Sequence, residues 1–224
     1  MKTGQVPPAV PSTPAPMPGT ATVITHGNPR LPEVALTFDD GPGEYTLRIL
    51  AILQHYKARA TFFSIGQNIT QFPMYLQQVL AGNHAVGNHT FTHPHLPTLS
   101  FASIHRELSA TQNVVHKEAG TYPMVFRPPY GEYNADVVKA ANQLGMTVVT
   151  WGADAHDWVT PQPSTDLIAS RILSAAGNGA IFLLHEAGGD RANTVAALPT
   201  IITGLQARGL TLVTLPQMLA NLDI

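Results

Sequence analysis

From residue 32 onward, short runs of β-favouring residues alternate with segments of helical periodicity, and this alternation is the strongest constraint on the fold. Repeated strand–helix alternation is typical of a parallel α/β sheet. Seven strands fit a barrel-like sheet, and an open doubly wound sheet fits the pattern nearly as well. The seven predicted strands are residues 34–38, 60–64, 85–88, 124–126, 146–151, 180–184 and 210–215.

Capping residues place several helix boundaries between these strands. Ser100 is the predicted N-cap of a helix that runs to about residue 117, and Asn134 is the predicted N-cap of a helix that ends near Gly145. Another helix is predicted to begin at Ser164 or the residue after it. The last long helix is predicted at about residues 193–208.

Charge and composition exclude several classes of function. Twelve Lys and Arg residues against 14 Asp and Glu residues give a net charge of −2, so the chain has no basic stripe for nucleic acid. No stretch approaches the roughly 20 apolar residues of a membrane-spanning helix. The absence of cysteine excludes disulfides, thiolate metal ligands and thiol nucleophiles.

Residues 1–30 are predicted to be a Pro- and Thr-rich tail or linker, and residues 31–224 a folded domain. The first 18 residues read MKTGQVPPAVPSTPAPMP, a composition that favours extended polyproline conformations over a packed core. They contain no apolar core of the kind found in an intact signal peptide. Because linkers of this composition are common outside the cell, we expect an extracellular or cell-surface location.

Two adjacent carboxylates, Asp39 and Asp40, follow the first predicted strand within the segment TFDDGP. Each carboxylate is costly to bury without a partner, so one can bind a cation while the other remains free as a base. Asp-Gly-Pro is also strong turn chemistry, and the segment alone fits a turn equally well.

A histidine pair, His89 and His93, occurs in the segment HTFTH after the third predicted strand. Histidines four residues apart share one face of a helical turn, which suits two imidazoles on one metal ion. Pro94 disfavours helical geometry at His93, so a single turn at a strand end is predicted. Two His and one Asp leave an open coordination position and suit Zn²⁺, with Co²⁺ or Ni²⁺ also compatible.

Three further polar segments follow later strands. RPPYG places Arg127, a permanent cation that can hold a carboxylate, beside Tyr130, whose N–H lies in a proline-rich loop with few donors. DAHDW contains Asp157, and LLHE ends a strand at His185, which is either a structural histidine or a general acid held charged by a carboxylate. The pair Asp190-Arg191 either lines the cleft or closes a turn, and it is not assigned to catalysis.

All five polar clusters follow or end predicted strands, and in parallel α/β folds functional sites gather at the carboxyl edge of the sheet. In order, TFDDG, HTFTH, RPPYG, DAHDW and LLHE resemble the five motifs of the polysaccharide deacetylases of carbohydrate esterase family 4, the NodB homology domain. The resemblance covers about residues 32–222 and implies a distorted (β/α) barrel, usually with seven parallel strands. The resemblance also implies that residues 31–224 form a catalytic domain.

The resemblance implies roles for individual residues. Asp40, His89 and His93 match the ligands of a divalent metal, and Asp39 matches the catalytic base. Arg127 matches the residue that orients that base.

Other residues match the family's substrate pocket and acid. Tyr130 matches the residue whose backbone N–H helps bind the oxyanion, and it also contacts substrate. Trp158 and Leu183 match the walls of the acetyl pocket. His185 matches the catalytic acid and Asp157 its supporting carboxylate. Departures lie beside these positions: Glu186 stands where Asp is common, and Ala85 where Glu is common.

The implied activity is metal-dependent removal of N-acetyl groups from polysaccharides that contain GlcNAc, such as chitin, chitooligosaccharides or peptidoglycan, with release of acetate. We expect a monomer that takes an acetylated polysaccharide or oligosaccharide as substrate. Alternatives are an O-acetyl esterase acting on acetylated xylan, an amidase acting on a small cyclic or peptide amide, and a non-catalytic sugar-binding module. The last alternative predicts that a metal ligand or the base has been lost, whereas this chain keeps all of them.

Overall fold

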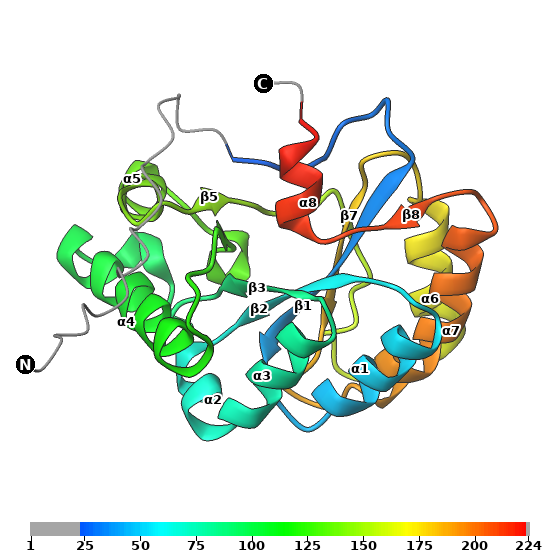
Figure 1. The fold of residues 1–224 in the computed structure, drawn as a ribbon, viewed down its shortest axis with the longest axis horizontal. Helices are drawn as coiled ribbons and strands as arrows, with labels where there is room; N and C mark the ends of the chain where they lie inside the picture. Colours follow the sequence, from blue (N-terminus) through cyan, green and yellow to red (C-terminus); the bar gives the residue numbers. More distant parts are fainter. Residues whose placement is uncertain (1–22, 223–224) are drawn as a thin grey trace, which may run out of the picture.

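The structure is a computed structural model that describes residues 23–222. Its strands form one sheet in the order β5-β4-β3-β2-β1-β7-β6, with β8 paired to β1, and every pairing is parallel. The sheet curls into an incomplete barrel (Figure 1), so the predicted α/β barrel with about seven parallel strands is confirmed. The strands are β1 (Glu33–Gly41), β2 (Ala60–Ser64), β3 (Ala85–Asn88), β4 (Val125–Phe126), β5 (Thr147–Val148), β6 (Ala153–Asp154), β7 (Ile181–His185) and β8 (Thr211–Leu212).

Helices cover the outside of the sheet in nearly the same order as the strands, because α1 to α6 lie in connections between neighbouring parallel strands. Figure 1 shows α1, α6 and α7 on one side of the curled sheet, and α4 and α5 on the other. Within the described residues, no helix is long and apolar enough to cross a membrane. The helices are α1 (Thr46–His55), α2 (Gly66–Gln71), α3 (Pro73–Ala81), α4 (Phe101–Ala119), α5 (Ala135–Gln143), α6 (Thr165–Ser174), α7 (Ala192–Gln206) and α8 (Leu215–Ala220).

The predicted helix caps are confirmed. The side chains of Ser100, Asn134 and Ser164 each accept a hydrogen bond from the backbone N–H three residues further on, at 3.3, 3.0 and 3.3 Å. Such bonds satisfy donors that the first helical turn leaves unpaired. At the other end of α4, Gly120 takes the left-handed conformation that commonly ends a helix.

The first predicted strand, 34–38, extends to Gly41 as β1, and two other predicted strands differ more strongly from the structure. The strand predicted at 146–151 ends at Val148, and the chain forms a separate strand, β6, only after Gly152. The strand predicted at 210–215 is limited to β8, because the hydroxyl of Thr214 accepts from the N–H of Gln217 and begins α8. Helices α2, α3 and α8 are additional elements that the sequence did not predict.

Successive side chains of strand β1 point alternately to the outside and to the inside of the barrel. Val34, Leu36 and Phe38 are fully buried against the surrounding helices. Ala35 packs instead with apolar residues of the barrel interior, where Thr37 also lies. The same alternation makes residue 39 the next interior position. Because it lies near the end of β1, it reaches the carboxyl end of the barrel, where a site is expected.

Residues 23–30 lie against the domain, although the prediction assigned residues 1–30 to a tail. The N–H of Ile24 donates to the carbonyl of Val148 at 2.9 Å, and the N–H of Gly27 donates to the carbonyl of Gly179 at 2.7 Å. This segment therefore bridges the interval between β5 and the start of β7. The rest of the predicted tail, residues 1–22, lies outside the described residues.

Candidate active site

A pocket of about 320 Å³ opens at the carboxyl edge of the sheet. It is where the five polar segments meet, as the convergence argument predicts. Eight of the ten predicted site residues line it; the other two, Arg127 and Asp157, are fully buried behind it. The lining residues are Asp39, Asp40, His89, His93, Tyr130, Trp151, Asp154, Trp158, Leu183, His185, Gly188 and Arg191.

A bulge at the end of β1 lets two consecutive carboxylates face one pocket. In a regular strand Asp39 and Asp40 would point to opposite faces of the sheet. The register with β2 shifts between Asp39 and Gly41, and Asp40 has a φ of 71°. Bulges of this kind re-aim a side chain beside functional sites. Asp39 therefore keeps its inward direction, while Asp40 turns toward the histidines.

The loop after β3 carries His89 and His93, and it does not form the single helical turn that the sequence predicted. Thr90 and His93 have φ values of 67° and 61°, which interrupt helical geometry. The loop is held by the carboxylate of Glu107 on α4, which accepts the N–H groups of Phe91 and Thr92 at 2.9 and 2.8 Å. The two histidines converge through this loop geometry, with ring centroids 4.9 Å apart.

Asp40, His89 and His93 form a cluster suited to a metal ion, with one potential ligand atom from each lying within 4.8 Å of the others. Nε2 of His89 and Nε2 of His93 lie 3.5 and 3.3 Å from Oδ1 of Asp40. Two ligands of a tetrahedral Zn²⁺ ion, each about 2.0–2.2 Å from it, are about 3.3–3.6 Å apart. Oδ1 of Asp40 is also buried and has no hydrogen-bond partner among the described residues. The residues therefore fit a divalent cation.

The protonation of this cluster also suits a cation. Nδ1 of His89 lies 2.7 Å from the carbonyl of Arg127, which can only accept, so Nδ1 carries a proton and Nε2 is the nitrogen that faces the cluster. Burial and the charge of His89 lower the pKa of His93, although nearby carboxylates oppose the shift. Burial alone would raise the pKa of Asp40, but the neighbouring histidines lower it to about 2.

Asp39 is paired with a guanidinium inside the barrel. Nη1 of Arg127 donates to Oδ1 of Asp39 at 2.7 Å, and Nη2 donates to the carbonyl of Thr150 at 3.0 Å. Arg127 is fully buried and Asp39 is 3% exposed, so the ion pair lies inside the barrel. The contact uses one carboxylate oxygen. Oδ2 of Asp39 lies on the side of His89, 3.8 Å from its Nε2.

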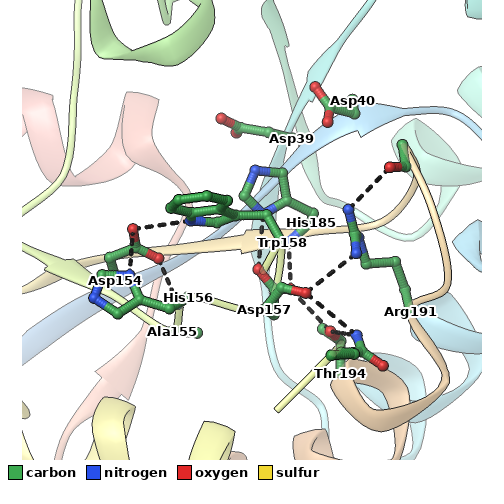
Figure 2. Close-up of polar contacts among 12 residues, drawn as sticks. Asp39, Asp40, Asp154, Ala155, His156, Asp157, Trp158, His185, Arg191 and Thr194 are labelled. Atoms are coloured by element: carbon green, nitrogen blue, oxygen red, sulfur yellow. Dashed lines mark hydrogen bonds and ion pairs between the residues drawn. The ribbon is translucent and has the colours of Figure 1, made fainter. Parts of the chain in front are cut away.

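His185 ends β7 directly beside Asp39, since the parallel register pairs these two residues. Its Nδ1 contacts Oδ1 of Asp157 at 2.7 Å, and its backbone N–H donates to Oδ2 of the same carboxylate at 2.9 Å. Burial alone would lower the pKa of His185, but Asp157, with Asp39 and Asp40, raises it above its ordinary value. Figure 2 shows Asp157 directly beneath the imidazole.

Aromatic side chains flank the pocket. Tyr130, with a φ of 59°, is 55% exposed, and its ring stacks on His95 with centroids 4.0 Å apart. Gly131 and Glu132 donate the hydrogen bonds that close this turn, and the N–H of Tyr130 takes no part in them. Trp158 is 52% exposed, and its indole N–H donates to Asp154 at 3.2 Å, as Figure 2 shows.

Comparison with known proteins identifies the family. A family model described as polysaccharide deacetylase matches residues 26–149, which is more than half of the chain. The chain belongs to the polysaccharide deacetylase family. The resemblance inferred from the five motifs is thereby confirmed.

Relatives of this polysaccharide deacetylase share both sequence and fold. A peptidoglycan-N-acetylglucosamine deacetylase of Bacillus cereus is 37% identical over 188 residues, which cover 83% of this chain and 68% of the relative. A chitooligosaccharide deacetylase of Azorhizobium caulinodans is 34% identical over 196 residues, covering 82% and 92%. The crystal structure of the Bc1960 peptidoglycan N-acetylglucosamine deacetylase superposes with a TM-score of 0.84 and 35% identity, covering 88% of this chain and 92% of that one.

Four residues that line the pocket of this deacetylase were not among the predicted site residues: Trp151, Asp154, Gly188 and Arg191. Asp154 is the first residue of the DAHDW motif and Trp151 ends the predicted strand before it, so their positions were the available signal. Arg191 is 5% exposed and packs into the site, which favours the cleft interpretation of Asp190-Arg191 over a simple turn. Asp190 meanwhile accepts from the hydroxyl of Tyr45 at 2.7 Å.

Glu186, the residue where Asp is common, is fully buried beside the site. Burial raises its pKa to about 8, and the charges of Asp39 and Asp40 add to the shift, while a hydrogen bond from the Thr46 hydroxyl opposes it. Within residues 23–222 its Oε1 has no hydrogen-bond partner, and it lies against Gly41, where a Cβ would clash with it. The longer side chain of Glu thus occupies space that only glycine leaves free.

Proposed function

We propose that this protein is a divalent-metal-dependent deacetylase that removes N-acetyl groups from GlcNAc residues of peptidoglycan or chitooligosaccharides and releases acetate. One observation carries the proposal: a three-ligand cluster shares a pocket with a buried carboxylate and a carboxylate-supported histidine. The named activities of the Bacillus cereus and Azorhizobium relatives support the choice of substrate.

Asp40, His89 and His93 would hold the cation, and their one-oxygen, two-nitrogen donor set favours Zn²⁺, with Co²⁺ or Ni²⁺ also suitable. When bound, such a cation supplies Lewis acidity, which polarises an acyl oxygen and makes water more acidic. The orphaned Oδ1 of Asp40 supports this assignment, because a buried unpaired carboxylate oxygen is otherwise costly.

Asp39 would act as the general base. Arg127 occupies Oδ1 and fixes the carboxylate, which leaves Oδ2 to accept a proton from the attacking water. As the water oxygen bonds to the acetyl carbon, the backbone N–H of Tyr130 would donate to the developing oxyanion. Trp158 and Leu183 would enclose the acetyl methyl group.

His185 would act as the general acid. Its Nδ1 is engaged by Asp157, so Nε2 is the nitrogen available to give a proton to the leaving amine as the C–N bond breaks. The raised pKa of His185 favours the charged form that this step needs. The balance is one water and one amide consumed, and one acetate and one free amino sugar formed.

The substrate would be a polymer or oligomer bound by a monomer outside the cytoplasm. The exposed rings of Tyr130 and Trp158 line the pocket, which suits stacking on sugar rings. The Pro- and Thr-rich composition of residues 1–18 supports a surface or extracellular location.

Acetate release tests the proposal. N-acetylchitooligosaccharides, peptidoglycan and acetylated xylan are each incubated with the purified protein, with chelated protein, and with protein resupplied with Zn²⁺ or Co²⁺. We expect release from GlcNAc-containing substrates that stops on chelation and returns with metal. Release from xylan alone would instead make the protein an O-acetyl esterase. No release from any of the three by metal-loaded protein would refute the proposal and point to a small amide or a binding role.

A further inference from the structure

The Asp157 carboxylate, which contacts His185, is also held by a residue on the side away from His185. Asp157 is fully buried, and Oδ2 accepts both the backbone N–H of His185 and the hydroxyl of Thr194, the latter at 2.8 Å. Oδ1 faces Nδ1 of His185. Figure 2 shows Thr194 and His185 on opposite sides of Asp157, so the carboxylate lies between α7 and the end of β7.

The direction of the Thr194 hydrogen bond follows from its neighbours. Oε1 of Gln162 accepts the backbone N–H of Asn193 at 3.1 Å, which turns Nε2 of the same amide toward Thr194. Nε2 can only donate, so the Thr194 oxygen accepts from Gln162. The single hydroxyl proton of Thr194 is therefore directed to Asp157.

Arg191 holds the backbone of the same residue. Its Nη1 donates to the carbonyl of Asp157 at 3.1 Å. Its other hydrogen bonds join the carbonyls of Ala187, Gly188 and Asp190 at 3.0, 3.2 and 2.9 Å. Arg191 is 5% exposed and forms no ion pair with a carboxylate among residues 23–222. The buried guanidinium donates hydrogen bonds to four carbonyls, and these bonds fix the loop before α7 against the segment that carries Asp157.

We propose that Thr194 and Arg191 are positioning residues for the His185–Asp157 pair, acting from the first turn of α7. The inference rests on the proposed role of His185 as proton donor. Thr194 fixes the rotation of the Asp157 side chain and Arg191 fixes its main chain, so Oδ1 keeps Nδ1 of His185 engaged and Nε2 directed at the leaving group. Neither residue touches the reacting atoms.

Such a role predicts a defect that depends on the leaving group. An amide expels a basic amine, which must be protonated as it leaves, whereas 4-nitrophenyl acetate expels a stable anion that needs no proton. Misplacing the acid therefore slows the first reaction and spares the second. A general structural defect would displace Asp39 and the metal ligands too, and it would slow both reactions equally.

The test compares Thr194→Val, which has nearly the same shape without the hydroxyl, with Thr194→Ser, which keeps the hydroxyl. On N-acetylchitooligosaccharides we expect Thr194→Val to lower kcat by about 10–100-fold, part of what a general acid contributes, with KM and bound metal unchanged. Thr194→Ser should stay near wild type, and 4-nitrophenyl acetate hydrolysis should stay near wild type in both. Arg191→Lys, which cannot span four carbonyls, should also lower kcat on the amide while the bound metal stays unchanged.

A second measurement uses the amide substrate alone. In a His185→Ala background, adding Thr194→Val should cause no further loss, because the residue through which it acts is gone. Equal losses on amide and ester, an undiminished kcat on the amide, or an additive loss in the His185→Ala background would each overturn the positioning role. Absence of metal-dependent acetate release by the wild type would overturn the proposed function instead.

Discussion

Replacing Arg127 by methionine should strongly destabilise the protein, because Arg127 neutralises a carboxylate inside the barrel. Its side chain is fully buried. Nη1 donates to Asp39 and to the hydroxyl of Thr37, both at 2.7 Å, and Nη2 donates to the carbonyl of Thr150 at 3.0 Å. The guanidinium also lies 4.2 Å from the ring centroid of Phe63.

The magnitude follows from what the substitution leaves behind. Methionine keeps much of the side-chain length, so the main loss is the charge that faces Asp39. Removing one partner of a buried ion pair costs about 3–5 kcal/mol, since the other charge stays buried without compensation. Asp39 is 3% exposed and cannot recover that energy from water. At about 2–4 °C per kcal/mol for a domain of this size, the Tm should fall by about 6–20 °C.

Urea unfolding of metal-free protein, followed by circular dichroism, measures the effect. Exposed Arg106 on α4 provides a matched control, and Arg106→Met should change the free energy of unfolding by no more than about 0.5 kcal/mol. In the double variant Arg127→Met/Asp39→Asn no unpaired carboxylate charge remains at residue 39. The loss in the free energy of unfolding should therefore be about 0.5–3 kcal/mol smaller than the sum of the two single losses. A loss below about 1 kcal/mol for Arg127→Met, the value of a surface pair, or strict additivity in the cycle, would refute the reasoning.

Three further predictions concern the site itself. Asp39→Asn should bind metal like wild type in calorimetric titration but lose turnover; full activity would remove Asp39 from the role of base. His93→Ala should purify without stoichiometric metal by elemental analysis, and wild-type metal content would exclude His93 as a ligand. Burial raises the pKa of Glu186 from 4.5 to about 8, so between these values the unfolded chain binds fewer protons than the folded one. Metal-free wild type should therefore lose stability as pH rises from about 4.5 to 8, and Glu186→Gln should flatten that decline in urea titrations; an unchanged slope would show that Glu186 is ionised.

The parts of the fold that the sequence predicted depend on local chemistry. Ser100, Asn134 and Ser164 cap helices because a side-chain oxygen reaches an N–H only three residues away. The strands at 60–64 and 85–88 have the predicted bounds, since short β-rich runs mark them clearly. The edge at which the motifs gather was also predictable, because parallel strands place their carboxyl ends together.

The geometry inside the site depends on contacts that no local pattern contains. The spacing of His89 and His93 suggested a helical turn, but Glu107 on α4 holds their loop in a different conformation. Asp39 and Asp40 were recognisable as a pair, but the bulge that directs both into one pocket is a property of the pairing of β1 with β2. Residue types were therefore easier to predict than the backbone that aims them.

The order of strands in the sheet decides which chemical groups become partners. Asp39 and His185 are 146 residues apart in the chain, yet β1 and β7 are neighbours and their register places these two residues side by side. A base and an acid on adjacent strands can serve one bond without either strand moving, because the sheet fixes their separation. The proposed acid, His185, contacts Asp157, and the hydroxyl of Thr194 in the first turn of α7 donates to that carboxylate from the side away from β1. In the proposed mechanism, proton donation thus depends on the start of a helix that the sequence predicted as a helix but did not assign to the site.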